Sequence, residues 1–180
     1  MKASLTPLLF ILLLLTFSCS KDENCDNPVD CLPPLTQTGA NTAGCLVNGR
    51  VLLPSGRSLG SGSVLHSQYL FHQEAYIFSI GINDRKNNQL VFIRNNAKLE
   101  EGGFYPIELK SDTTGSGAYI IGGAGSGIGY ITTNEEIGQL HITKLDEAKK
   151  IISGTFWFDA INNEDDIVQV REGRFDVHYQ

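Results

Sequence analysis

The dominant pattern of the chain is an alternation of apolar and polar residues with a period of two. It is clearest over residues 76–82, 139–143 and 155–160, and turns rich in Gly, Asn and Asp separate such segments. Successive side chains of a strand point to opposite faces, so this alternation predicts half-buried strands, and the short connections predict antiparallel pairing. Only residues 96–101 and 145–150 carry weak helix signals, each too short to stand alone.

The number of predicted strands leaves no room for crossover helices. We therefore expect an all-β domain, an antiparallel up-and-down β-barrel or flattened β-clam of lipocalin-like type, because closure of a sheet removes its exposed edges. The alternative is a two-sheet β-sandwich.

The closing strand carries two apolar sets of opposite parity. Val168 and Val170 form one set, and the odd positions of residues 175–179 form the other. A straight strand cannot bury both sets on one side. We therefore predict a bulge or sharp bend at Glu172-Gly173, with Gly173 in the left-handed conformation. The same register would turn outward Arg174, Asp176 and His178.

The N-terminus has the pattern of a secretory signal. Lys2 is followed by an unbroken apolar run over Leu8–Leu15, too short to span a bilayer permanently, and Ser18-Cys19 follows. The junction resembles the lipobox of bacterial lipoproteins, although Thr16 stands where Leu is usual. The resemblance implies a signal peptide over residues 1–18 and lipidation of Cys19.

The residues after Cys19 sharpen the expected location. Ser20, Lys21, Asp22 and Glu23 are similar to the signal that exports Bacteroidota lipoproteins to the outer face of the outer membrane. The lipid bilayer would then be a partner through N-terminal acyl chains. Residues 19–43, which include proline pairs, read as a lipidated linker, and 44–180 as a single β domain.

Composition restricts partners and cysteine chemistry. The 180-residue chain has a net charge of −6 and no basic cluster, which argues against nucleic-acid binding. Export implies an oxidising compartment, where Cys25 and Cys31 enclose a turn-prone stretch suited to a disulfide. Cys45 would then be a buried thiol, but pairing of Cys31 with Cys45 is the open alternative.

Two signatures bracket the domain. Residues 33–49 run Pro-Pro-Leu-Thr-Gln-Thr-Gly-Ala-Asn-Thr-Ala-Gly-Cys-Leu-Val-Asn-Gly, and their final Asn-Gly is a strong hairpin signal. The closing stretch runs from Ile152-Ser153-Gly154-Thr155-Phe156 to Gly173-Arg174-Phe175-Asp176. Together they resemble a family of Bacteroidota outer-membrane lipoproteins of unknown function. The resemblance implies a shared β fold and no known activity.

The short motifs of the chain favour no enzyme chemistry. Residues 56–60 match G-x-S-x-G without the strand and helix that a nucleophile elbow needs. Residues 115–129 are glycine-rich but lack a phosphate-loop lysine. Residues 162–166 are acidic but lack the spacing of a calcium loop. Thr113, in Asp-Thr-Thr, resembles a short O-glycosylation signal.

Scattered titratable residues give weaker candidates. A glycosidase would need two carboxylates at a defined separation, and a metal site would need clustered ligands. The carboxylate candidates are Glu108, Asp159, Asp165 and Asp176, and the histidines are His66, His72, His141 and His178. We expect no cofactor, no metal and no catalytic residue.

We therefore expect a surface-anchored, non-catalytic binding module of the bacterial envelope. Its ligand would be a small apolar molecule, a glycan or an envelope protein. The alternatives are a carboxylate-dependent glycan hydrolase and a structural spacer.

Overall fold

The computed structural model describes residues 25–57, 62–109, 115–122 and 127–180. The elements are η1 (Pro28–Cys31), β1 (Thr42–Val47), β2 (Arg50–Leu52), β3 (Leu65–His72), β4 (Ala75–Asp84), β5 (Gln89–Asn95), β6 (Phe104–Ile107), β7 (Ser116–Ile121), β8 (Ile128–Ile131), β9 (Gly138–Asp146), β10 (Ile151–Ile161) and β11 (Ile167–His178).

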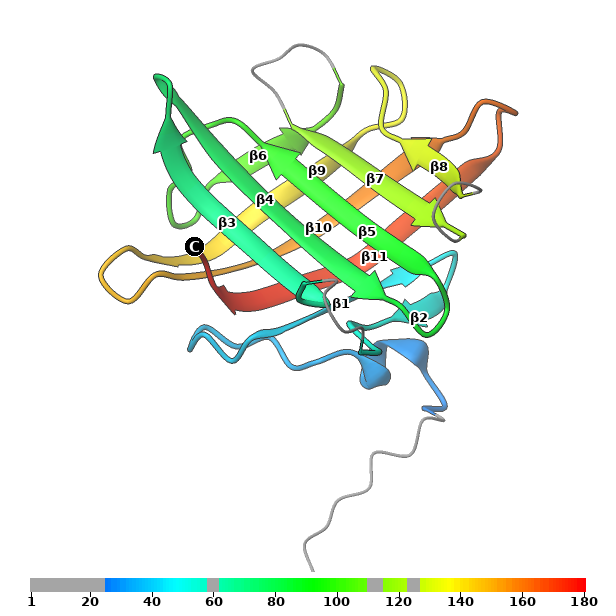
Figure 1. The fold of residues 1–180 in the computed structure, drawn as a ribbon, viewed down its shortest axis with the longest axis horizontal. Helices are drawn as coiled ribbons and strands as arrows, with labels where there is room; N and C mark the ends of the chain where they lie inside the picture. The colour runs from blue at the N-terminus through cyan, green and yellow to red at the C-terminus, as the bar shows by residue number, and fades with distance from the viewer. Residues whose placement is uncertain (1–24, 58–61, 110–114, 123–126) are drawn as a thin grey trace, which may run out of the picture.

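The strands form one antiparallel sheet that curls into a half-barrel (Figure 1). Its order is β2-β1-β11-β10-β8-β7-β5-β4-β3, and β9 and β6 extend it from the remaining edge of β10. The expected all-β, barrel-like or clam-like fold is confirmed. A continuous sheet takes the place of the two separate sheets of the sandwich alternative.

The sheet forks at β10, and the fork creates two layers. β8 and β9 follow each other along the same edge of β10, with Ile131 paired to Ile161 and Gly138 paired to Phe158. Between them, residues 132–137 leave the ladder. Thr132 fixes this detour, because its amide donates to Gly117 O at 2.9 Å and its hydroxyl accepts from Gly117 N at 3.1 Å. As Figure 1 shows, β7, β5, β4 and β3 then cross over β9 and β10.

One hydrophobic cluster fills the space between the layers. Phe78, Phe158 and Ile142 are among its fully buried side chains. The apolar positions of the alternating segments, Leu140 and Ile142 in β9 and Phe156, Phe158 and Ala160 in β10, are buried, while Gln139 and Trp157 point outward. Burial of such side chains is the main driving force for folding.

The chain ends complete the closure. The amide of Tyr69 donates to the carbonyl of Gln180 at 3.2 Å, and the Gln180 amide donates to Ser67 O at 3.2 Å. The C-terminal residue therefore pairs with part of the outer edge of β3. At the other end of the sheet, Asn48 (φ 48°) and Gly49 (φ 77°) form the predicted hairpin turn between β1 and β2.

The predicted bulge in β11 is confirmed, but its cause differs from the expected one. Trp157 of β10 lies opposite two residues, because Phe156 pairs with Gly173 and Phe158 with Val170. The left-handed residue is Glu172 (φ 53°). Gly173 serves a different purpose, since a Cβ there would lie 2.4 Å from the ring of Phe156.

The three residues predicted to face outward do share the outer face, but one of them is not exposed there. Arg174 and His178 are accessible, whereas Asp176 is buried, with 1% of its surface exposed. The N-terminal segment covers it. Residues 32–41, expected to belong to a linker, instead pack on the outer face, and Leu32 is buried. The linker assignment therefore extended too far toward the domain.

Residues 36–40 wrap the carboxylate of Asp176. Its oxygens accept hydrogen bonds from Thr36 Oγ1 (2.7 Å) and from the amides of Thr38 (2.9 Å), Gly39 (2.8 Å) and Ala40 (3.1 Å). We call this arrangement the Asp176 clasp.

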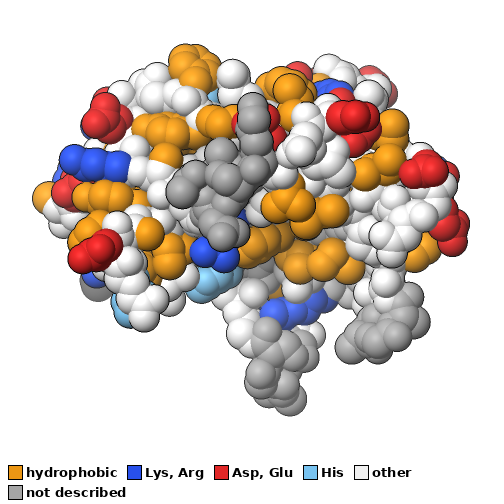
Figure 2. Space-filling model, turned by 90° about the horizontal axis from the view of Figure 1, so that it is seen from above, with side chains coloured by type: hydrophobic (Ala, Val, Ile, Leu, Met, Phe, Trp, Pro, Cys, Tyr) orange, Lys and Arg blue, Asp and Glu red, His pale blue; other side chains and the backbone are white. Residues whose placement is uncertain are grey.

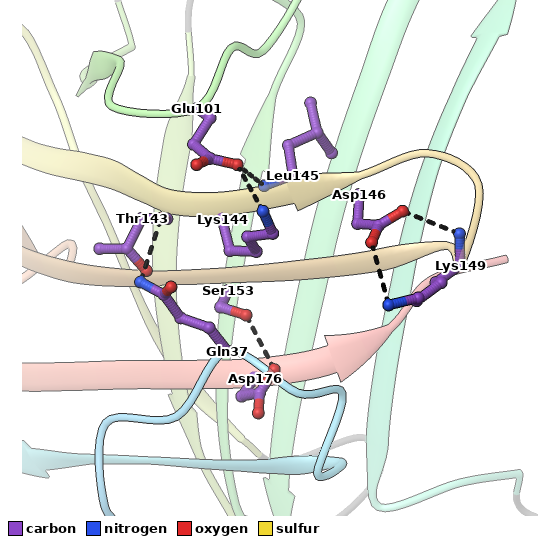
Figure 3. Close-up of polar contacts among 9 residues, drawn as sticks. All are labelled: Gln37, Glu101, Thr143, Lys144, Leu145, Asp146, Lys149, Ser153 and Asp176. Carbon is purple, nitrogen blue, oxygen red and sulfur yellow. Dashed lines mark hydrogen bonds and ion pairs between the residues drawn. The ribbon is translucent and has the colours of Figure 1, made fainter.

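Two contacts from the sheet complete the clasp. Ser153 of β10 donates to Asp176 Oδ1 at 2.8 Å, and Gln37 donates to the carbonyl of Thr143 at 3.1 Å (Figure 3). Burial alone would raise the pKa of Asp176. The hydrogen bonds that its carboxylate accepts from residues 36–40 and from Ser153 outweigh burial and hold the pKa well below its usual range.

The cysteines adopt the first of the two pairings considered. Cys25 and Cys31 form a disulfide across η1, and Cys45 is a free, fully buried thiol. Burial raises the pKa of Cys45 to about 12, so the thiol stays protonated and inert.

Several sequence-based expectations lie outside the described residues. These are the signal peptide, Cys19, the stretch Ser20, Lys21, Asp22 and Glu23, and Thr113. Ser58 of the G-x-S-x-G match lies outside them as well.

Replacing Gly173 with Ala should destabilise the domain by about 1–3 kcal/mol, because the added methyl group must displace the core ring of Phe156. Urea denaturation of the two proteins measures the difference. Gly129→Ala is the matched control, since a Cβ at Gly129 of β8 meets nothing within 4 Å. Equal stability of Gly173→Ala and the wild type would contradict the assigned role.

Asp176→Asn should lower the free energy of unfolding at pH 7 by about 2–4 kcal/mol, because an amide cannot accept all the hydrogen bonds of the clasp. The folded-state pKa of Asp176 is depressed, so its contribution is present above the unfolded-state pKa of about 3.9 and is lost as the pH falls below it. Between pH 7 and pH 3, the free energy of unfolding should therefore fall less in Asp176→Asn than in the wild type, as urea denaturation at each pH would measure.

Asp165→Asn, in the exposed tip of the β10–β11 hairpin, is the control. It should change neither the free energy of unfolding at pH 7 nor its dependence on pH. An unchanged pH dependence in Asp176→Asn would show that the clasp does not hold an ionised carboxylate.

Candidate functional site

A cleft on the outer face of β6, β9, β10 and β11 is the best candidate site. Strand register places its residues in two rows across the sheet. In the first row, His141 lies opposite both Phe104 and Thr155, and Thr155 also lies opposite Arg174. In the second row, Gln139 lies opposite Pro106 and Trp157, and Trp157 faces the bulge at Arg171 and Glu172. Neighbouring strands are about 4.8 Å apart, so four strands span about 14 Å.

Two exposed aromatic rings lie in the cleft, each held from one side. Phe104 is 61% exposed and stacks on His141, with ring centroids 4.1 Å apart and planes 6° apart. Trp157 is 39% exposed, and the guanidinium of Arg171 lies 5.4 Å from the centre of its ring. Each ring is thus supported by one neighbouring side chain and keeps part of its surface exposed.

The position of Phe104 depends on the loop that precedes β6. The Glu101 carboxylate accepts from the Leu145 amide at 3.2 Å and pairs with Lys144 at 3.2 Å, as Figure 3 shows. The hydroxyl of Tyr105 accepts from the amide of Glu100 at 2.6 Å. These contacts fasten the loop to β9 and set the edge of the cleft.

The charges of the cleft are paired. Arg171 forms an ion pair with Asp159 at 2.6 Å and donates to the carbonyl of Phe158 at 3.0 Å. Arg174, with a side chain only 14% exposed, pairs with Glu172 at 3.1 Å. Two cations and two carboxylates therefore cancel within this part of the surface.

The cleft has a volume of about 350 Å³, with Leu35 of the N-terminal segment also lining it. That volume is at the low end of ligand sites in proteins. Within the described part of the chain, the side chains of Gln139, His141 and Thr155 make no hydrogen bond, so their polar atoms are available to a ligand.

The structure separates the four carboxylates considered for glycoside hydrolysis. Asp176 is enclosed in the clasp, Asp159 is paired with Arg171, and Asp165 lies in the tip of the β10–β11 hairpin. Glu108 follows β6. Among the residues that line the cleft, Glu172 is the single carboxylate.

The histidines are also apart. His66 and His72 are exposed on β3, and His178 covers Gly39 at the end of β11. His141 alone lines the cleft. Over the residues that the structure describes, no group of three His, Cys, Asp or Glu side chains is placed to hold a metal ion.

The acidic run at residues 162–166 is a hairpin tip held by its own residues. Asn162 Oδ1 accepts from the amides of Glu164 and Asp166, both at 2.9 Å. The described parts of the glycine-rich stretch, 115–122 and 127–129, contribute to β7 and β8.

A second cleft of about 420 Å³ lies between β3 and the end of β11. Its lining includes residues 63–65, Ser67, Asn41, Pro54, Val177 and His178, and the buried hydroxyl of Ser67 has no hydrogen-bond partner. It contains no aromatic platform comparable with Trp157 and Phe104.

The rest of the surface carries scattered apolar side chains. Figure 2 shows several separate hydrophobic groups among polar and charged side chains on the face seen from above. Ile120, Ile121, Ile128 and Ile131 are exposed on the β7–β8 hairpin, where Ile121 pairs with Ile128, and Ile167 is exposed at the start of β11. Apolar residues on the surface are normal in folded domains.

Sequence reasoning missed the cleft. Its clearest signal was Trp157, a large aromatic residue with the same parity as Thr155 and Asp159 on the polar side of a strand. Phe104 could not be assigned, because β6 is short and pairs only with β9.

Comparisons with known proteins define the family but not the activity. No curated protein and no solved structure matches the chain. Within the described residues, no helix has the length and apolar character needed to cross a membrane. A family model, described as a domain of unknown function (DUF6252), matches residues 77–177, which is more than half of the chain. This match covers β10, all but the last residue of β11 and most of the cleft, and the chain therefore belongs to the DUF6252 family.

Proposed function

We propose that this protein is a lipid-anchored, non-catalytic binding module of the bacterial envelope, and that its ligand binds in the outer cleft. The observation that carries the proposal is the exposed Trp157, held in a fixed orientation by Arg171 beside unpaired polar side chains. Large aromatic rings that remain exposed on a rigid sheet are typical of recognition surfaces.

The hydrophobic interior favours the outer cleft over an internal site. The cluster between the layers includes bulky, fully buried residues such as Phe78, Phe158 and Leu52. A packed core of this kind supports the sheet and orients its outer side chains. The outer cleft, by contrast, combines concavity, apolar area and available hydrogen-bonding groups.

The residues of the cleft support binding rather than hydrolysis. A glycosidase needs an acid and a second carboxylate on opposite sides of the bond to be cleaved. Glu172 is the one carboxylate that lines the cleft, and it is engaged with Arg174. A pure spacer would have no need of a preoriented aromatic cleft, so the binding role explains more of the surface.

The proposed anchor fits the way the N-terminal segment packs. Cys19 would carry the acyl chains, and the disulfide Cys25–Cys31 lies only six residues further along. From Leu32 onward the segment is packed on the domain and held by the clasp. The tether would therefore be short, and the domain would lie near the membrane at the cell exterior.

Ligand binding in the cleft should change the fluorescence of Trp157, which is the single tryptophan of the chain. Residues 19–180 with Cys19→Ser would be titrated with maltopentaose, sodium decanoate and pentaalanine, which represent glycans, lipids and peptides. We expect a saturable change with one class and recovery of that ligand chemically unchanged. Conversion of the ligand to products would overturn the non-catalytic assignment.

Phe104→Ala and Phe71→Ala form a matched pair for this titration, because both phenylalanines are 61% exposed and only Phe104 lines the cleft. The first variant should weaken binding and the second should not. Equal weakening in both would place the binding site elsewhere.

Cys19→Ser should abolish incorporation of labelled palmitate and release the protein from the membrane fraction, because the thiol is the proposed acylation site. The double variant Cys25→Ser/Cys31→Ser removes thiols that form the disulfide and should keep both label and membrane association. Protease added to intact cells should degrade the wild-type domain. Labelling that persists in Cys19→Ser would refute the anchor, and protection until lysis would refute surface exposure.

A further inference from the structure

We propose that the ligand of the outer cleft is a neutral oligosaccharide, an inference that rests on the binding function proposed above. A sugar ring has apolar C–H faces and an edge of hydroxyl groups. The cleft offers surfaces for both at a spacing set by the sheet. Four features of the structure point to this ligand class.

The first feature is the pair of aromatic rings. Phe104 lies on β6 and Trp157 on β10, two strands away and two residues along, which corresponds to about 10 Å across the sheet and about 7 Å along it. His141 and Arg171 each support one ring and leave much of it exposed. Two fixed apolar platforms at this spacing suit the C–H faces of successive or alternate sugars in a short chain.

The second feature is the set of polar groups between the rings. Gln139 and His141 come from β9, and Thr155 comes from β10. An amide, an imidazole and a hydroxyl together offer donors and acceptors, as sugar hydroxyls require. None of the three side chains makes a hydrogen bond to another described residue, and the contact of His141 with Phe104 is a ring stack, so binding would not break a protein hydrogen bond.

The third feature is the balance of charge. Arg171 is neutralised by Asp159, and Arg174 by Glu172. An anionic ligand would have to compete with Glu172 for Arg174, and a cationic ligand would have to compete with Arg174 for Glu172. An uncharged polar ligand leaves both pairs intact.

The fourth feature is the position of the cleft on the face of the sheet. The backbones of β9, β10 and β11 are already paired with one another, so a peptide lying over Trp157 finds no free edge there on which to add a strand, and the edge strand β6 lies at the margin of the cleft. Recognition must come from side chains. This favours a ligand that is read by ring stacking and hydroxyl contacts over an extended peptide.

The strained residue of the bulge is part of the same surface. Glu172 lines the cleft with φ 53°, a backbone conformation that is unfavourable for residues other than glycine. The bulge also places Glu172 opposite Trp157, close to Arg174, which ends the row that begins with Phe104.

The test is isothermal titration calorimetry of residues 19–180 carrying Cys19→Ser. The probes are maltopentaose, cellopentaose, xylopentaose, mannopentaose and chitopentaose, with pentagalacturonate as the anionic comparison and sodium decanoate and pentaalanine as the other classes. We expect saturable binding of at least one neutral glycan and weaker binding of pentagalacturonate. Phe104→Ala should lower the affinity for the neutral glycan by about tenfold, and Phe71→Ala should leave that affinity unchanged.

Glu172→Gln tests the role of charge balance. Freed from its partner, Arg174 should bind pentagalacturonate several-fold more tightly than in the wild type, while affinity for the neutral glycan does not rise. Melting curves of all variants confirm that each is folded.

The outcomes separate the two proposals. Binding of decanoate or pentaalanine alone, with a change in Trp157 fluorescence, would overturn the glycan inference and keep the binding function. A wild type that prefers pentagalacturonate would overturn the inference that the ligand is neutral. Absence of binding by every probe would overturn both proposals for this cleft.

Discussion

The buried carboxylate of Asp176 is the constraint on which the rest of the domain depends. A charge removed from water costs several kcal/mol unless other groups compensate it, and no cation among the described residues forms an ion pair with Asp176. Hydrogen bonds from residues 36–40 and from Ser153 take the place of solvent. The N-terminal segment must therefore stay on the sheet for the closing strand to remain folded, and an apparent linker becomes part of the domain.

The clasp also explains why two distant signatures bracket the chain. Thr36, Thr38 and Gly39 belong to the opening signature, and they bind the Asp176 that ends the closing one. Ser153, near the start of the closing stretch, contacts the same carboxylate. The signatures are therefore two halves of one hydrogen-bonded unit. This unit fixes where the proposed tether leaves the domain, and it places Leu35 at the margin of the cleft.

Sequence reasoning predicted what depends on local alternation and missed what depends on register between strands. The inward positions of β9 and β10, the Asn48-Gly49 turn and the break in β11 followed from side-chain parity and turn chemistry. The burial of Asp176 could not follow from parity, because parity assigns a face and does not say whether another segment covers it. The cleft was missed for a related reason. Its two rows combine residues from four strands, including β6, and their alignment appears only once the pairing is known.

The bulge links the core to the proposed site. Val170 and Phe175 must both face inward although their parity differs, so β11 needs one additional residue between them. That residue lets Arg171 and Arg174, three positions apart, both reach the outer face, with Glu172 between them. Gly173 permits the ring of Phe156 to pack directly under the irregularity. The requirement to bury two apolar sets on one side of a strand thus produces, on the other side, the paired charges beside Trp157 that favour the proposed uncharged ligand.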